Sequence, residues 1–389
     1  MLRSLFSGIS GLRAHQTMLD VVGNNIANVN TTGYKTSQTQ FQDTLSQLIT
    51  SASSAQDGTG GTNPAQVGLG VKVAGVTTSF TQGSSQLTGR STDMMIQGDG
   101  FFVVRQGSQS YYTRAGSFDF DSTGQMVMAG SGSLVQGWMA LNGVVDTNSA
   151  TSDLRIPTGA LMAAKATTSS IFEGNLQSDA DTGTVLTRDV TVYDSAGNES
   201  TVSLQFTKSA TGWSVSTDGG ATSTAMTFAG DGSLTTPTSL TASGITVDLS
   251  TITGFAGVNT VKVLSQDGYA AGTLESFSLG SDGVITGTFS NSLKQVIGQI
   301  AIASFNNPAG LEKAGGSLFQ TTANSGLAQV GTPGSGGRGT LVGGSLEMSN
   351  VDLSQEFTSL IIAQRGFQAN SRIITTSDTI LEELINLKR

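Results

Sequence analysis

Apolar residues recur at spacings of three, four or seven positions near both ends of the chain. Near the start, the spaced residues are Leu5, Ile9, Leu12, Leu19, Val22 and Ile26. Near the end, they are Leu353, Phe357, Leu360, Phe367, Ile374, Leu381 and Ile385. This spacing places the side chains along one seam of an α-helix, and a long seam requires a partner helix. The pattern therefore predicts a long helix at each end of the chain, with these residues forming a coiled-coil interface for assembly.

The C-terminal segment carries a second apolar stripe beside the first. Its members are Ile361, Ile373, Ile380, Leu384 and Leu387. A helix with two apolar stripes requires neighbours on two sides, which the single partner in a helical hairpin does not provide. We therefore expect the terminal helices to pack against copies of the same chain. An ordinary intramolecular hairpin that closes the fold is the alternative.

Between the helices, the pattern changes to short alternating runs that are bounded by turn residues. Val190 and Val192 alternate with polar residues, as do Val202, Leu204 and Phe206, and the sequence DSAG at 194–197 separates the two runs. This arrangement predicts a β-hairpin with one buried face. The segment just after the first helix differs, because the spacing of its apolar residues between 41 and 49 indicates a short helix, followed by a flexible Gly- and Ser-rich stretch.

These patterns together predict a mixed fold, mainly β with long terminal α-helices, in which several domains are nested along the chain. The terminal helical coiled-coil domain comprises residues 1–35 and 352–389, and linker segments occupy 36–70 and 331–351. An inner β domain comprises residues 71–155 and 267–330, and an outer β domain is inserted at 156–266. We expect the β domains to be sandwiches or barrels.

Composition argues against several classes of function. The net charge is −9 without any basic run, so we expect no nucleic-acid partner. The chain has no cysteine and a single histidine, His15, and no catalytic constellation can be assembled, so we expect neither an enzyme nor a cofactor or metal. No apolar run approaches the ~20 residues that span a bilayer, so we expect no membrane insertion. Arg13 interrupts the apolar start, which indicates that no signal peptide is cleaved.

Two terminal motifs resemble a known family. The N-terminal motif contains Asn24, Asn25, Ala27, Asn28, Thr31, Gly33, Tyr34 and Lys35. The C-terminal motif contains Asn350, Asp352, Gln364, Arg365 and Asn370. Both resemble the signatures of the flagellar rod and hook family. The body segments GLGVKVAGV, IPTGALMAAKATTSS and TVYDSAGNESTVSLQF are similar to its hook members.

The resemblance implies a structural subunit that polymerises with itself into the curved helical tube of the extracellular flagellar hook, a flexible joint that transmits torque from rod to filament. It also implies export through the flagellar type III apparatus and contacts with rod, hook cap and hook–filament junction proteins. A distal rod protein of the flagellar basal body is the nearest alternative. A surface adhesin or glycan-binding protein is the alternative from another class.

Overall fold

The computed structural model describes residues 2–54, 57, 60–156, 159 and 161–387. Its chain forms two compact units. Unit 1 comprises Met1–Ile156, Ser278–Thr286 and Val296–Arg389, and unit 2 comprises Pro157–Phe277 and Gly287–Gln295. The terminal residues 1, 388 and 389 of the predicted helical domain lie outside the described residues, as do residues 55, 56, 58 and 59 of the predicted linker.

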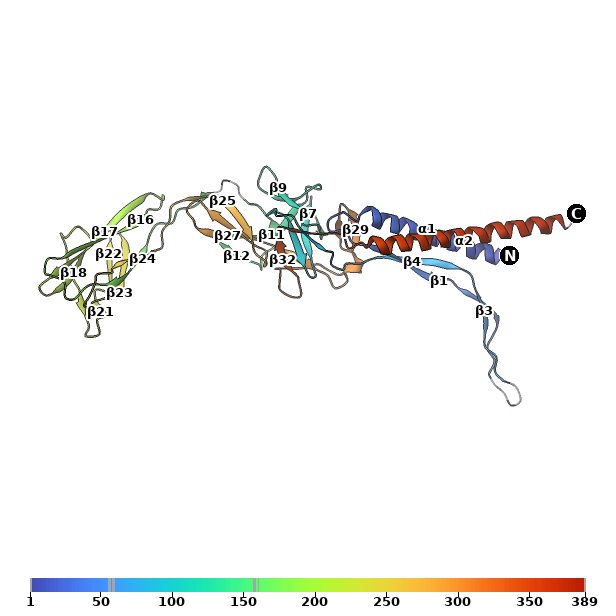
Figure 1. Cartoon of the computed structure of the whole chain (residues 1–389), viewed down its shortest axis with the longest axis horizontal. Coiled ribbons are helices and arrows are strands. Elements are labelled where there is room, and N and C mark those ends of the chain that lie inside the picture. Colours follow the sequence, from blue (N-terminus) through green and yellow to red (C-terminus); the bar gives the residue numbers. More distant parts are fainter. Residues whose placement is uncertain (1, 55–56, 58–59, 157–158, 160, 388–389) are drawn as a thin grey trace. The chain divides into compact units, whose positions relative to one another are not determined.

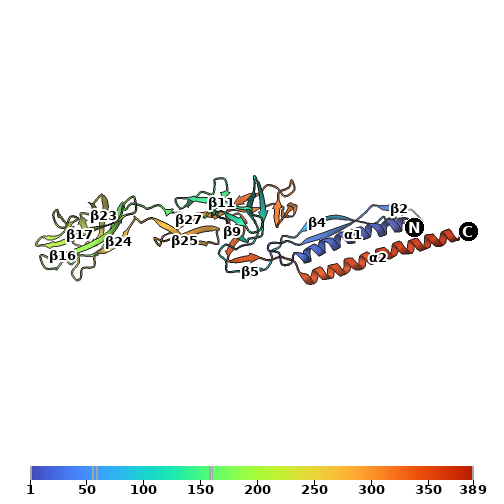
Figure 2. The ribbon, with the colours of Figure 1, turned by 90° about the horizontal axis from the view of Figure 1, so that it is seen from above.

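Two long helices of unit 1, α1 (Leu2–Ala27) and α2 (Leu353–Asn386), lie side by side and run in opposite directions (Figures 1 and 2). Gly11 faces Asn370 and His15 faces Gly366, so the paired residue numbers add up to 381 in both cases. The Asp352 carboxylate caps the start of α2 by accepting hydrogen bonds from the backbone amides of Ser354 and Gln355. The prediction of a long helix at each end is confirmed.

The segment that follows α1 forms strands, so the short helix predicted at residues 41–49 is wrong. Strand β1 (Ser37–Asp43) pairs antiparallel with β4 (Val71–Thr78), and β2 (Ser46–Thr50) pairs with β3 (Ala65–Gly68). The apolar spacing was compatible with a helix, but residues 41–43 pair with 71–73 about 30 residues later, and residues 46–50 pair with 65–68 about 20 residues later. This pairing prevails over local preference. The predicted linker at 36–70 is therefore largely a strand ribbon.

The predicted linker at 331–351 also contains paired strands. Strand β32 (Thr340–Gly343) pairs with β6 (Met94–Gln97), and β33 (Ser345–Glu347) pairs with β5 (Ser85–Leu87). The glycines that suggested a loop cluster before these strands, at 331–339. Pairing with strands about 250 residues earlier in the chain gives this segment its extended form, which local composition does not reveal.

The body of unit 1 is a β-structure around a central strand, β7 (Phe101–Gln106), whose first four residues are buried on both faces. On one face Phe101 packs edge-on against Phe80, Phe305 and Phe319, and on the other Phe102 packs against Phe118. The other strands of this body are β8 (Gln109–Thr113), β9 (Phe118–Phe120), β10 (Met126–Met128), β11 (Leu134–Leu141), β12 (Val144–Val145), β13 (Ser152–Asp153), β28 (Ile302–Ser304), β29 (Glu312–Gly315), β30 (Leu318–Gln320) and β31 (Gln329–Gly331), with a 3-10 turn at Pro308–Gly310.

Unit 2 contains two four-stranded sheets that share one apolar core. One sheet has the order β22-β23-β15-β24, and the other has the order β16-β17-β18-β19. Their bounds are β15 (Ser169–Asn175), β16 (Val185–Tyr193), β17 (Glu199–Ser209), β18 (Gly212–Ser216), β19 (Thr224–Ala225), β22 (Ser239–Ala242), β23 (Ile245–Thr253) and β24 (Lys262–Gln266). The β16–β17 hairpin confirms the predicted turn, in which the Asp194 carboxylate accepts from the amides of Ala196 and Asn198.

Six further strands lie in the described residues, three short ones and three of six to eight residues. They are β14 (Leu161–Met162), β20 (Thr227–Phe228) and β21 (Leu234–Thr236), together with β25 (Gly272–Leu279), β26 (Val284–Phe289) and β27 (Lys294–Ile300). The predicted fold class, mainly β with terminal helices, is confirmed. The division into inner and outer domains at residues 156 and 266 stays a prediction.

Candidate assembly surface and the junction of the chain ends

Small and polar residues form the closest points of the contact between α1 and α2, and Gly8 also lies against Ile373 and Ile374. A Cβ atom at Gly11 would come within 2.7 Å of the Asn370 amide, and one at Gly366 would come within 2.5 Å of the His15 ring. Ala14 on α1 and Ala363 on α2 are also buried. Glycines and alanines allow the two helix backbones to approach closely, so this contact uses little of the apolar surface that the sequence provides.

The predicted interface residues of α2 remain largely exposed in the single chain. Between 37% and 71% of the surface is exposed at Leu353, Phe357, Phe367, Leu381 and Ile385, whereas Leu360 and Ile374 are half-buried. The second stripe is exposed as well, at Ile361, Ile373, Ile380, Leu384 and Leu387. On α1, Val22 is buried, and the half-buried predicted residues are Leu5, Ile9, Leu12, Leu19 and Ile26. Contact with α1 therefore does not cover the apolar stripes of α2.

The amide of Asn25 joins three segments at the base of the helix pair. Its Nδ2 donates to the Ser37 carbonyl at 2.8 Å and to Glu356 Oε1 on α2 at 3.1 Å. Its Oδ1 accepts from the Ser37 amide at 3.0 Å and from the Tyr34 hydroxyl at 3.1 Å. Burial raises the pKa of Glu356, and the hydrogen bond from Asn25 partly opposes that change. Asn25 thus ties the end of α1 to strand β1 and to the first turn of α2.

Gly33 allows the chain to pass directly over the body of unit 1. Its φ is +67°, and a Cβ atom there would lie 2.5 Å from the backbone nitrogen of Ala115. Its amide donates to the Glu347 carbonyl at 2.8 Å. Only glycine combines this backbone conformation with so close an approach.

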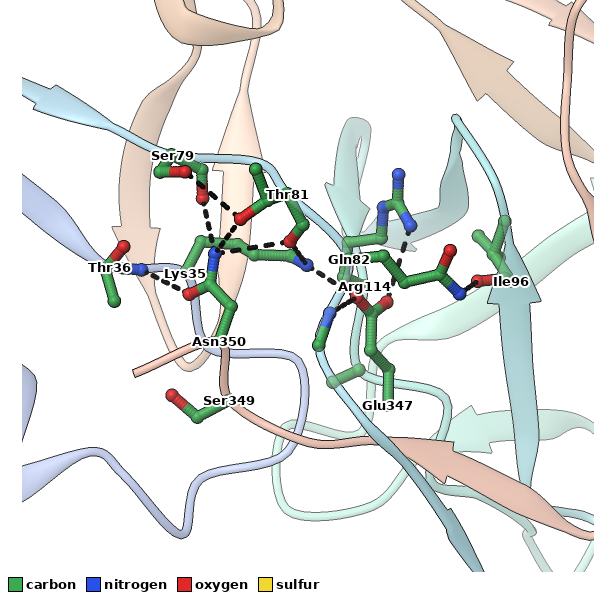
Figure 3. A network of polar contacts seen from close by, with 12 residues as sticks. Lys35, Thr36, Ser79, Thr81, Gln82, Ile96, Arg114, Glu347, Ser349 and Asn350 are labelled. Atoms are coloured by element: carbon green, nitrogen blue, oxygen red, sulfur yellow. Dashed lines mark hydrogen bonds and ion pairs between the residues drawn. The ribbon is translucent and has the colours of Figure 1, made fainter. Parts of the chain in front are cut away.

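A buried charge cluster joins the segment after α1 to the segment before α2 (Figure 3). The Lys35 ammonium lies 2.5 Å from Glu347 Oε1, and Arg114 Nη1 lies 3.4 Å from Oε2 of the same carboxylate. The side chains of Lys35 and Glu347 are fully buried, and that of Arg114 is 2% exposed. Lys35 also donates to the Thr81 carbonyl at 2.7 Å, and the Gly83 amide donates to Glu347 at 2.9 Å.

The cluster holds two cations around one carboxylate. Burial lowers the pKa of Lys35 and of Arg114, and the charge of Glu347 opposes this change at both residues. Arg114 Nε has no hydrogen-bond partner among the described residues, although its guanidinium lies 5.2 Å from the centre of the Phe101 ring. Glu347 is therefore the counter-charge that both buried cations share, and Asp99 adds a weaker charge at Arg114.

Asn350 completes the junction beside this cluster (Figure 3). Its Oδ1 accepts from the Thr36 amide at 2.8 Å, and its Nδ2 donates to the Ser79 carbonyl at 3.0 Å and to the Thr81 hydroxyl at 2.9 Å. This one amide therefore connects the strand that leaves α1, the end of β4 and the segment that enters α2.

The remaining motif residues have local roles or face solvent. Asn28 donates to the Asn24 carbonyl and accepts from the Thr31 hydroxyl, which closes the turn after α1. Asn370 donates to the Gly366 carbonyl within α2. The exposed motif residues are Asn24, Ala27, Asp352, Gln364 and Arg365. The structure therefore gathers most of the N-terminal motif and part of the C-terminal motif at one junction.

Sequence reasoning missed Glu347, Arg114 and the small residues of the helix contact. A signal for Glu347 was present, because it stands between Leu346 and Met348 in a chain where only 12% of residues are charged. A charge at such a position suggests burial with a partner. His15 is half-buried between Gly366 and Phe41, whose ring centre lies 5.8 Å away, so it belongs to the helix contact.

Neither helix in the described part of the chain contains a stretch apolar enough to span a bilayer. Within the same residues, no three His, Cys, Asp or Glu side chains lie close enough together to hold a metal ion.

Three family descriptions match the chain. Residues 5–35 match "Flagella basal body rod protein", residues 95–223 match "Flagellar hook protein FlgE/F/G D1 domain", and residues 342–387 match "Flagellar basal body rod FlgEFG protein C-terminal". The first and last matches contain the two terminal motifs and most of the two helices.

Full-length relatives agree with these matches. The chain is 39% identical to flagellar hook protein FlgE of Treponema pallidum and 40% identical to that of Borreliella burgdorferi, covering all of both chains in each case. It is also 35% identical to flagellar basal-body rod protein FlgG of Bacillus subtilis, again over the full length of both. The helices, the junction and these relatives together define the class of a structural protein of the bacterial flagellum. Within that class, the chain belongs to the flagellar hook protein FlgE/F/G family.

Proposed function

We propose that the chain is the subunit of the flagellar hook and that it polymerises with itself into a curved helical tube. The observation that carries this proposal is that both apolar stripes of α2 remain largely exposed although α2 already packs against α1. Covering about ten such side chains contributes on the order of 8–15 kcal/mol gross, at half the value for complete burial. A gain of that size favours packing against further copies.

As a hook subunit, the chain would also contact other flagellar proteins, because the hook lies between the rod and the filament. The tube would meet rod proteins at one end and the hook cap or hook–filament junction proteins at the other. Export through the type III apparatus fits a chain without cysteine, which forms no disulfide before it reaches its site. A distal rod protein is the second candidate, because the rod protein FlgG of Bacillus subtilis is nearly as similar over its full length.

The test is electron microscopy of the purified full-length chain under polymerising conditions. A hook subunit is expected to give curved tubes, whereas a distal rod protein is expected to give straight rods. Leu381→Asp places a charge in the exposed stripe of α2 and should abolish polymers while leaving the circular dichroism of the β-structure unchanged. Leu327→Asp is the matched control, because Leu327 is 91% exposed and lies outside the helices. Normal tubes from Leu381→Asp would refute the role of the stripe.

A further inference from the structure

The end of α2 extends beyond the start of α1. Because paired residue numbers add up to 381, Leu2 at the start of α1 lies level with about residue 379. Residues Ile380–Asn386 therefore project past α1 by about 10 Å, or two helical turns. We call residues 380–387 the α2 tip.

The α2 tip is both apolar and acidic. Its exposed apolar residues are Ile380, Leu381, Leu384, Ile385 and Leu387, with 38–84% of their surface exposed. Glu382 and Glu383 lie among them, and Asp378 lies about one turn earlier, all three exposed. Lys388 and Arg389 follow in the sequence and lie outside the described residues. An apolar surface of this kind on a helix end requires a complementary surface to cover it.

A groove of about 400 Å³ between α1 and β4 offers the complementary chemistry. Its apolar lining includes Phe6, Ile9 and Val73, and Phe6 is 64% exposed. Two basic side chains, Arg13 and Lys72, also line it and are exposed. The groove thus combines apolar surface with positive charge, while the α2 tip combines apolar surface with negative charge.

We propose that the α2 tip of one subunit binds the groove between α1 and β4 of the next subunit. Leu381, Leu384 and their apolar neighbours cover Phe6 and Ile9, while Glu382 and Glu383 face Arg13 and Lys72. The two surfaces lie on different parts of the chain, so each subunit offers one free tip and one free groove. Such a head-to-tail contact continues from copy to copy and produces an open polymer. This inference rests on the proposed function, because it assigns a specific contact within the polymer.

The absence of native cysteine allows a direct cross-linking test. One batch of full-length chain carries Ile9→Cys and a second carries Leu384→Cys, and the two are copolymerised in equal amounts in an oxidising glutathione buffer. Within one chain, Ile9 lies about 18 Å along the helix axis from Leu384, too far for a disulfide between them. We therefore expect covalent dimers that join one Ile9→Cys chain to one Leu384→Cys chain. In an equal mixture, about a quarter of the tip–groove contacts join the two kinds in the required order, so up to about half of the chains can enter such dimers.

Two arms complete the test. Leu327→Cys in place of Ile9→Cys is the matched control and should give no dimer with Leu384→Cys. Separately, Arg13→Glu with Lys72→Glu should raise the critical concentration for polymerisation about tenfold, and adding Glu382→Lys with Glu383→Lys should restore it. Polymers that form without the specific dimer would overturn this contact and leave the proposed function standing. If the unmodified chain forms no polymer, even when seeded with hook fragments, the proposed function fails as well.

Discussion

Replacing Glu347 with Gln tests whether the buried charge cluster holds the junction of the chain ends together. The substitution removes the carboxylate that faces both Lys35 and Arg114. Lys35 then loses its counter-charge, and Arg114 keeps only the weaker charge of Asp99. Removing one partner of a buried ion pair costs about 3–5 kcal/mol. The Gly83 amide can still donate to the amide oxygen of Gln, so the loss comes mainly from charge.

Lys35→Met is the matched comparison. It removes one of the two cations, so the carboxylate keeps Arg114 as a charged partner and Gly83 as a donor. We expect a smaller loss of about 1–3 kcal/mol, since one hydrogen-bonded partner of a buried group is removed while an ion pair remains. Both variants change the same buried cluster, but Glu347→Gln removes its carboxylate whereas Lys35→Met removes one of its two cations.

The two tryptophans allow unit 1 to be followed by itself. Trp138 is buried in unit 1 and Trp213 is buried in unit 2, so a Trp213→Phe background leaves fluorescence that reports on unit 1. In urea, Glu347→Gln should lower the unfolding midpoint by about 1 M or more at a slope of ~3 kcal/mol/M. The reasoning is refuted if Glu347→Gln destabilises unit 1 no more than Lys35→Met does.

Two further predictions concern the same junction. Gly33→Ala should destabilise unit 1 by more than ~2 kcal/mol in the same urea assay, because its Cβ would meet Ala115. Gly107→Ala is the control: Gly107 has a similar φ of +63°, but no atom lies within 4 Å of the added Cβ, so the cost should be only ~1–2 kcal/mol. Glu356 has a raised pKa in the folded chain, so its contribution to stability is fully present below pH 4.5 and is lost as pH rises through the raised value. In Glu356→Gln, the melting temperature should therefore fall less between pH 4.5 and pH 7 than it does in the unmodified chain. An equal fall in both chains would contradict this assignment.

The parts of the fold that depend on local pattern could be predicted from sequence. The periodic stripes gave both helices, and the Asp194 turn gave a hairpin whose strands are adjacent in the chain. Predictions failed where pairing is remote. Strand β1 forms because β4 pairs with it, and Lys35 meets a carboxylate 312 residues away. Neither partner can be identified from one sequence, because hydrophobic periodicity carries no information about which distant segment lies opposite.

The junction also bears on how the exposed stripes can be used. Lys35 lies eight residues after α1 ends, and Glu347 lies six residues before α2 begins, so their contact fixes both segments where the helices leave the body. Asn25 adds a bond between the helices at the same end. Because the helix pair is held at its base, the α2 stripes have little conformational freedom before subunits associate. Less freedom is then lost on association, and this lowers the entropic cost of each new contact. Loosening the base should therefore weaken polymerisation even though no residue of the junction belongs to the α2 stripes.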